Sequence, residues 1–475
     1  MYSSCHIKFL EMLGWHGSEL EEFLPEWLRA AKLLGLNDSD VEFAVEKWIP
    51  EYWDLSLEGV KKFIAACIRD AADLAKGEEY LARGDKLIYV NMPGVPLPLM
   101  ANVTASKGRV HVHYPAYLIV TVLGAFFNKY CGKYNPSCDN GSMRSPCANC
   151  AMNRIRYNAS TESELAQPTV HWNWGLRCNE APKTDEMISC DMGSTGSDVY
   201  VTLPHDVDSG IDEADYRPKI DYLSKKLRDA QERVSRLTGF AVSEADISEA
   251  AGAYIKYMDK LQTLTDLVMN ADPMPLSGAE LTMFGIFVEM CLGIGNESIL
   301  DALDTVIGEV RVRISKGEGL LPKDSPRLAC HFNPLCVPWL DKAFRDNGVC
   351  LVQGKLLPFA DKFRKFLSEE DDIYKAIARI ILSIPSTMNM LDEARINAEL
   401  VTRYPVDGAL YGFYSSDVWV GALQKTIVKV IEAETGVPHF YIEGELWNSG
   451  DGSYDSHMAI VRSICNYLKI SNIGT

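Results

Sequence analysis

Apolar side chains recur every three or four residues over much of the first 80 positions, a spacing that predicts amphipathic helices. The clearest runs are SELEEFLPEWLRAAKLLG from Ser18 and LEGVKKFIAACIRDAADLAKG from Leu57. Asp40 and Ser56 are of the residue types that cap helix N-termini. We therefore expect residues 1–80 to form a helical N-terminal region.

The pattern then changes to short runs rich in β-branched residues. DKLIYVNMP from Asp85, RVHVHYP from Arg109 and VYVTLPHD from Val199 are bounded by turn residues and predict strands. A long helical tract follows over residues 216–314, with a break near Asp272–Pro275. Helical periodicity therefore separates two strand-containing regions.

The last third alternates between strands and helices. PRLACHF, VCLVQG, ALYGF and PHFYIEGEL predict strands, and the helix that precedes the last of them ends at Gly436, a typical C-terminal residue. Such alternation implies parallel sheets with right-handed crossovers. We predict an α/β protein with two doubly wound parallel-sheet domains, an additional helical N-terminal region and a helical middle segment. The expected bounds are 1–80, 81–215, 216–322 and 323–475.

Ligands of doubly wound sheets bind beyond the carboxyl ends of the strands. Cys330 stands at a predicted strand end, and Ser415, Ser416, Asp417 and Glu443 stand at or just after two others. A carboxylate there is usually solvated, but it can also act as an acid or base. Ser416, Asp417 and Glu443 are our candidate catalytic residues. The chain has no glycine-rich nucleotide motif and no nucleophile elbow.

Composition narrows the classes of partner. The 475 residues are 47% hydrophobic, enough for a sizeable core, and the net charge of −18 disfavours nucleic acid and anionic membranes. No apolar run approaches the roughly 20 residues needed to span a bilayer, and the first residues do not resemble a signal peptide. We expect a cytoplasmic protein in a reducing compartment.

The 13 cysteines are therefore expected to be thiols or metal ligands rather than disulfides. Cys67, Cys291 and Cys465 lie in apolar helical patterns and are read as core residues. The clustered cysteines are Cys131, Cys138, Cys147 and Cys150, with Cys178 and Cys190 downstream and a second pair at Cys330 and Cys336. Thiolates select zinc, copper(I) or iron–sulfur clusters.

Structural zinc usually pairs two CxxC knuckles, whereas this chain has one, Cys147–Cys150. The pattern favours an iron–sulfur site, with structural zinc and inert loop thiols as the alternatives. Cys150 directly precedes a predicted short helix, Ala151 to Tyr157, whose N-terminus would favour a thiolate. Arg154 and Arg156 add positive charge nearby, although such residues usually lie on a solvated helix face.

Several segments, taken in order, match the pattern of one known family. Cys150-Ala-Met-Asn-Arg-Ile is similar to its first cluster-ligand segment, and Pro168 to Cys178 is similar to its second. VYVTLPHD, the helix over 217–237, RLACHFNPLC, DGALYGFYSSD and TGVPHFYIEGEL follow in the same order. Over roughly residues 85–470 the chain resembles the 2-hydroxyacyl-CoA dehydratase family, which includes the subunits of ATP-dependent benzoyl-CoA reductase.

The resemblance implies a [4Fe–4S] cluster on three thiolates, with one iron open to the thioester oxygen of an acyl-CoA substrate. An ATP-dependent iron–sulfur activator protein would inject an electron, and the resulting ketyl radical would lose water from a 2-hydroxyacyl-CoA. Cys150 and Cys178 would be ligands, with Cys147 or Cys336 as the third. A paralogous second subunit in a heterodimer, or a second copy in a homodimer, is implied as well.

One segment departs from the family. Tyr414-Ser415-Ser416-Asp417 stands where relatives usually carry a ligand cysteine. Ser416 or Asp417 could take that position, Cys131 or Cys138 from the cysteine-rich loop could replace it, or the site could be altered. The surplus cysteines would also allow the double-cubane cluster of one family branch. The alternatives to a dehydratase subunit are thus a benzoyl-CoA-reductase-type subunit and a non-catalytic or electron-relay partner subunit.

Overall fold

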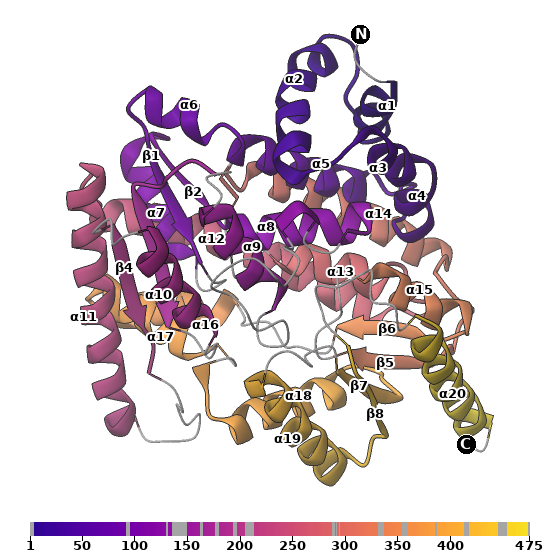
Figure 1. The fold of residues 1–475 in the computed structure, drawn as a ribbon. Helices are drawn as coiled ribbons and strands as arrows, with labels where there is room; N and C mark the ends of the chain where they lie inside the picture. Colours follow the sequence, from indigo (N-terminus) through magenta and orange to yellow (C-terminus); the bar gives the residue numbers. More distant parts are fainter. Residues whose placement is uncertain are drawn as a thin grey trace.

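Two four-stranded parallel sheets and the helices around them make up the fold (Figure 1). The α/β class, the parallel strands and the helical N-terminal region predicted from the sequence are confirmed. The computed structural model describes residues 4–91, 96–129, 132–134, 150–161, 165–175, 180–192, 197–204, 213–286, 290, 292–293, 295–330, 337–353, 360–384, 387–412, 418–444 and 454–473. Within these residues, no helix is both long and apolar enough to cross a membrane.

The N-terminal region is a cluster of helices. Its elements are α1 (Ser4–Met12), α2 (Gly17–Leu34), α3 (Asp38–Phe43), the π-helical turn η1 (Ala44–Trp48), α4 (Ile49–Tyr52), α5 (Glu58–Leu74) and α6 (Gly77–Ala82). The apolar stripe of α5 is buried, as its periodicity predicts. Trp48 and Trp53 each donate an indole N–H to the Ala125 carbonyl at 2.9 Å, which ties this cluster to the next region of the chain.

The helix caps differ in detail from the sequence expectation. Asn37 is the N-cap of α3, and Asp40 completes its capping box from the third helical position. Ser56 does not cap α5. Instead the backbone N–H groups of Glu58 and Gly59 donate to the Glu309 carboxylate at 2.7 and 2.9 Å. A distant helix, α14 (Glu297–Lys316), therefore supplies the negative charge that the N-terminus of α5 favours.

Gly59 allows α5 and α14 to approach closely. A Cβ at this position would lie 2.5 Å from the backbone nitrogen of Val306. We expect Gly59→Ala to lower the free energy of unfolding by about 1–3 kcal/mol, because the two helices must move apart. Gly308→Ala is the matched control on α14: a Cβ there meets nothing within 4 Å, so alanine should stabilise by about 0.5–1 kcal/mol. Urea denaturation measures both, and equal effects would contradict the close approach.

The first sheet consists of β1 (Lys86–Val90), β2 (Val110–His113), β3 (Val170–Gly175) and β4 (Asp198–Thr202) in the order β2-β1-β3-β4. All of its pairs are parallel. The described helices and helical turns between these strands are α7 (Leu97–Ser106), α8 (Pro115–Thr121), the π-helical turn η2 (Val122–Phe126), the short 3₁₀ turn η3 (Gly132–Tyr134), α9 (Ala151–Thr161) and α10 (Glu180–Met192). Of these, the sequence predicted α9, as Ala151 to Tyr157; the others, α10 among them, were not predicted individually.

The second sheet repeats this arrangement. Strands β5 (Arg327–Cys330), β6 (Cys350–Gln353), β7 (Gly408–Gly412) and β8 (His439–Ile442) are parallel and lie in the order β6-β5-β7-β8. Its helices are α15 (Pro338–Asp346), α16 (Ala360–Glu369), α17 (Ile373–Leu382), α18 (Met390–Arg403), α19 (Val418–Thr435) and α20 (Tyr454–Ile473). The strand order therefore reverses between β1 and β3 and again between β5 and β7, the two places where such sheets bind ligands.

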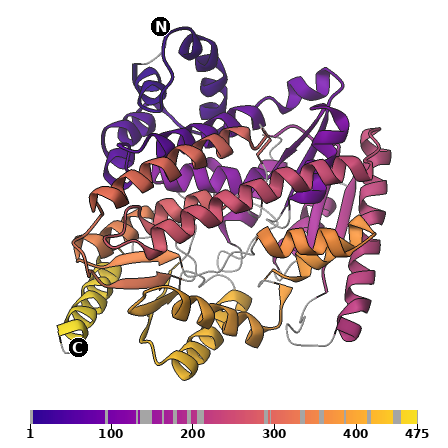
Figure 2. The same cartoon turned by 180° about the vertical axis from the view of Figure 1, so that it is seen from behind.

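The middle of the chain is helical, as predicted, and connects the two sheets. It comprises α11 (Glu213–Thr238), α12 (Glu244–Asn270), α13 (Gly278–Gly285) and α14, with the expected break after α12. Figure 2 shows α12 running across the back of the molecule. Helix α12 packs against α7 of the first sheet region and also against α16.

Helices α16 and α17 follow the second sheet's β6 in the chain but pack against the middle helices. Arg217 of α11 pairs with Glu370 at 3.1 Å, and Arg228 of α11 pairs with Asp372 at 2.9 Å. Lys375 of α17 forms a third ion pair, with Asp221 of α11 at 2.7 Å. A line of ion pairs thus fastens α17 to α11, the helix that also packs on β4.

His113, the last residue of β2, is fully buried in the core. The carboxylate of Asp73 lies 3.5 Å from its Nε2, and Tyr80 donates its hydroxyl to the same carboxylate. Gly293 packs directly on the ring, because a Cβ there would lie 2.2 Å from it. Burial lowers the pKa of His113 from 6.5 to about 4, against the opposing charge of Asp73.

This lowered pKa predicts acid sensitivity. Between about pH 6.5 and pH 4 the unfolded chain binds a proton at His113 that the folded chain does not. Unfolding free energy should therefore fall as the pH decreases through that window, by up to about 3 kcal/mol. Denaturation curves across this range should show a shallower pH dependence in His113→Gln than in the native protein. The exposed His16→Gln is the control, and an unchanged slope in His113→Gln would contradict the assignment.

Candidate functional site

Cys150 is the predicted ligand residue that the structure describes best. It directly precedes α9, and its carbonyl accepts the helix's first described hydrogen bond, from the Arg154 N–H at 3.1 Å. The helix was predicted over Ala151 to Tyr157 and continues to Thr161. Cys150 is half-buried. Its position at a helix N-terminus favours the thiolate form, as the sequence suggested.

The sulfur of Cys150 lies beside an amide and a carboxylate. Asn153, one turn along α9, donates its side-chain N–H to Cys150 Sγ at 3.4 Å. Glu180, the first residue of α10, accepts from the Cys150 backbone N–H at 3.0 Å and from the Asn153 amide at 3.4 Å. Both Asn153 and Glu180 are buried. These three residues therefore form one small cluster at the N-termini of two helices.

A chain of hydrogen bonds leads from this cluster to the first sheet. Arg156 donates to Asn153 Oδ1 at 2.9 Å and forms a buried ion pair with Asp185 of α10. Asp185 accepts from the Asn91 side chain at 2.5 Å, and Asn91 in turn accepts from the Trp174 backbone N–H at 3.2 Å. Asn91 immediately follows β1, and Trp174 belongs to β3. The cluster is thus anchored at the point where the strand order reverses.

Arg156 therefore differs from the sequence expectation. Its side chain is 8% exposed and that of Asp185 is 7% exposed, so Arg156 does not lie on a solvated helix face. A buried charge is costly unless it is paired and hydrogen-bonded. The pairing with Asp185 and the bond to Asn153 meet that requirement and fix how α9 and α10 pack.

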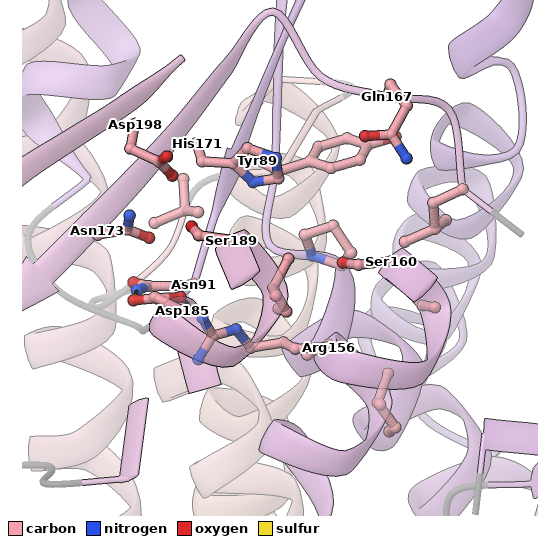
Figure 3. Close-up of a pocket in the computed structure, with 17 residues that line it drawn as sticks. Tyr89, Asn91, Arg156, Ser160, Gln167, His171, Asn173, Asp185, Ser189 and Asp198 are labelled. Atoms are coloured by element: carbon pink, nitrogen blue, oxygen red, sulfur yellow. Dashed lines mark hydrogen bonds and ion pairs between the residues drawn. The ribbon is translucent and has the colours of Figure 1, made fainter. Parts of the chain in front are cut away.

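A small cavity lined by both apolar and polar side chains lies between the first sheet and helices α8, α9 and α10 (Figure 3). Its volume is about 60 Å³, and its walls include Tyr89, His171, Asp198 and the Arg156–Asp185 pair. Burial lowers the pKa of His171 and raises the pKa of Tyr89, so both are neutral near pH 7. A cavity of this size with a few polar groups in its wall could hold a few ordered waters but not an acyl-CoA.

The structure places two other residues singled out from the sequence at strand ends. Cys330 is the last residue of β5 and is buried. Glu443 follows β8 with an exposed side chain, and its carbonyl accepts from His457 Nε2 at 2.6 Å. The remaining candidates lie outside the described residues, and their roles stay predictions: Cys131, Cys138, Cys147, Cys178, Cys336, Ser415, Ser416 and Asp417.

Cys67 and Cys465 are buried core residues, as predicted. Within the described ranges, the group of metal-type ligands with mutually close atoms is Cys5, His6 and Asp38. Trp27 donates its indole N–H to His6 Nδ1 at 3.0 Å, so Nε2 carries the ring proton and faces Asp38 at 3.2 Å. A metal on Nε2 would place that proton on Nδ1, against the Trp27 donor. The geometry therefore supports a structural hydrogen-bond bridge.

Sequence reasoning missed Asn91, Asn153, Glu180 and Asp185. The buried face of α10 recurs at helical spacing, but Glu180, Ala181, Thr184 and Asp185 make up that face, so hydropathy gives no sign of it. The useful signal would have been the polar residues of α9 at one-turn spacing, Asn153 and Arg156. Their partners are defined only by the packing of α9 on α10.

Two comparisons with known proteins bear on this site. The family model for the 2-hydroxyglutaryl-CoA dehydratase D-component matches residues 113–458, well over half of the chain. The match includes Cys150, both helices of the cluster and the whole second sheet. Strand β1 and the following residue Asn91 lie before the matched range, although β1 belongs to the same sheet as the matched strands β3 and β4. A comparison with curated proteins found no match.

Proposed function

The chain belongs to the family of the 2-hydroxyglutaryl-CoA dehydratase D-component, and we propose that it is the iron–sulfur subunit of an enzyme that removes water from a 2-hydroxyacyl-CoA. The observation that carries this proposal is the position of Cys150. Its sulfur stands at a helix N-terminus and accepts an amide N–H. Hydrogen bonds connect its surroundings to Asn91, at the point where the strand order of the first sheet reverses. These are the surroundings expected for a ligand thiolate.

The described part of the site fits an iron–sulfur cluster. A cluster bound by thiolates carries negative charge, and the N-terminus of α9 together with the Asn153 amide supplies positive dipoles beside the sulfur. Cys150 would hold the cluster together with Cys178, and with Cys147 or Cys336 as the third ligand. Cys131 or Cys138 could instead supply the ligand for which residues 415–417 offer no thiol.

A bound [4Fe–4S] cluster would supply the low-potential electron that activates the thioester for loss of the 2-hydroxyl. The chain's own residues would hold and orient that group. The buried Arg156–Asp185 pair fixes α9 against α10, and the Asn91 bridge fixes both to the first sheet. Such support keeps a ligand sulfur in one place while an electron and a substrate arrive.

The partners follow from the family. We propose a second, paralogous subunit, an ATP-dependent iron–sulfur activator protein and an acyl-CoA substrate. Membership of a dehydratase-component family supports a dehydratase over a benzoyl-CoA-reductase-type subunit. An assay with activator and reductant separates them: loss of water from 2-hydroxyglutaryl-CoA indicates a dehydratase, and ring reduction of an aromatic thioester indicates a reductase. Turnover by this chain with the activator alone would contradict the alternative that it is a non-catalytic partner subunit.

Anaerobic purification tests the cofactor itself. We expect a brown protein with bound iron and acid-labile sulfide and an EPR signal after reduction. Iron per chain distinguishes a single [4Fe–4S] cluster from a double-cubane cluster, which holds about twice as much iron. Colourless protein that stays free of iron after anaerobic reconstitution would contradict the proposed function.

A further inference from the structure

The orientation of the Asn153 side chain is fixed by its neighbours. Its Oδ1 accepts from Arg156 Nη1 at 2.9 Å, and a guanidinium can only donate. The amide nitrogen must therefore point the other way, where Cys150 Sγ and Glu180 Oε2 each lie at 3.4 Å. An amide nitrogen carries two hydrogens, so it can serve both acceptors at once.

This orientation is held firmly. Arg156 is itself fixed by the buried Asp185, which Asn91 holds in turn at 2.5 Å. Asn153 is 3% exposed, so water competes little for its hydrogens. A flip of the amide would place its oxygen against the Glu180 carboxylate and its N–H groups against Arg156, which is unfavourable on both sides. The structure thus provides a fixed N–H donor for one particular sulfur.

From this geometry we infer that Asn153 is a positioning residue that raises the reduction potential of the cluster bound through Cys150. The inference rests on the proposed function. An N–H bond to a ligand sulfur withdraws electron density from it, which favours the reduced cluster. The same amide nitrogen also donates to the carboxylate of Glu180, whose negative charge would add to that of the cluster.

Glu180 and Asn153 would together set the reduction potential of the cluster at this site. Glu180 lowers the potential through its charge, and Asn153 opposes that effect through its two N–H groups. The balance between a buried carboxylate and a buried amide would then tune how easily an activator reduces this subunit. Neither residue needs to touch the substrate for this role.

A redox titration tests the inference. Asn153→Leu removes the donor at similar volume, and we expect it to retain iron but to show a more negative midpoint potential by EPR than the native protein. Asn153→Asp should shift the midpoint further in the same direction, because it adds a charge. Asn158→Leu is the matched control: it lies on the same helix, is buried, and donates to the Tyr134 carbonyl at 2.7 Å. Its midpoint should equal that of the native protein.

An unchanged midpoint in iron-loaded Asn153→Leu would overturn the inference and leave the proposed function standing. Native protein without iron would instead overturn the proposed function. If Asn153→Leu fails to fold or loses its iron, a measurement on the native protein tests the same hydrogen bond. With asparagine labelled by ¹⁵N at the side-chain amide, ENDOR of the reduced cluster should show a ¹⁵N coupling. Absence of that coupling would refute the hydrogen bond to the ligand sulfur.

Discussion

Replacing Cys150 with serine is expected to remove most of the bound iron and, with it, activity. The hydroxyl is a harder and far less acidic ligand than a thiol, so it would not replace the thiolate at neutral pH. The loss should exceed the roughly 10- to 100-fold weakening that follows removal of an outer partner of a metal ligand. Iron and sulfide analysis and the visible spectrum of anaerobically prepared protein measure it.

Controls for this substitution are present in the same chain. Cys5 and Cys465 are buried, at 8% and 1% exposure, and pack in the hydrophobic core. Cys5→Ser and Cys465→Ser should keep the iron content of the native protein. Full iron and an unchanged spectrum in Cys150→Ser would show that the ligand assignment is wrong. Cys138→Ser is a separate test, because loss of iron there would show that the cysteine-rich loop supplies the missing ligand.

Arg156→Met is expected to cause the largest loss of stability. The substitution leaves Asp185 buried with its charge unpaired, and breaking a buried pair on one side costs about 3–5 kcal/mol. Asn153 also loses the donor that orients its amide. We therefore expect a lower urea midpoint together with weaker iron binding, measured on the same preparations.

Two further variants make this result specific. Lys225→Met breaks an exposed pair whose side chains are 73% and 52% exposed, and it should change stability by no more than about 1 kcal/mol. Adding Asp185→Asn to Arg156→Met should recover part of the loss, because the buried charge is removed. A double variant less stable than Arg156→Met would show that the ion pair is not the source of the effect.

Much of the fold followed from local pattern. Strands such as β1 and β4 carry concentrated β-branched and apolar residues, and α5 carries a regular apolar stripe, so each was recognisable alone. The order of the strands was not recognisable, because sequence order alone does not specify which parallel strands pair. Helices α10 and α18 were missed because much of their buried surface is polar. Asp392, Glu393 and Asn397 of α18, for example, are buried.

The candidate site was predictable to the same degree. Cys150 could be singled out because a cysteine before a short helix is a local feature. The residues that support it come from three separate stretches of chain, at Asn91, on α9 and on α10. Their meeting depends on a buried charge pair, and sequence patterns conventionally assign arginine to the surface. The other predicted ligands remain predictions from the sequence.

The ion pairs between α11 and α17 bear on how this chain could be dissected genetically. A fragment that began at residue 323 would carry the second sheet together with α16 and α17, but not the α11 and α12 surfaces on which those two helices pack. The complementary fragment would expose the surfaces of α11 and α12 that α16 and α17 normally cover. We therefore expect the two halves to fold together and coexpressed fragments to copurify. Because the pairs of Arg217, Arg228 and Lys375 are partly exposed, raising the salt concentration should weaken this association without abolishing it. Although the two sheets have the same strand order, we expect that neither half folds independently of the other.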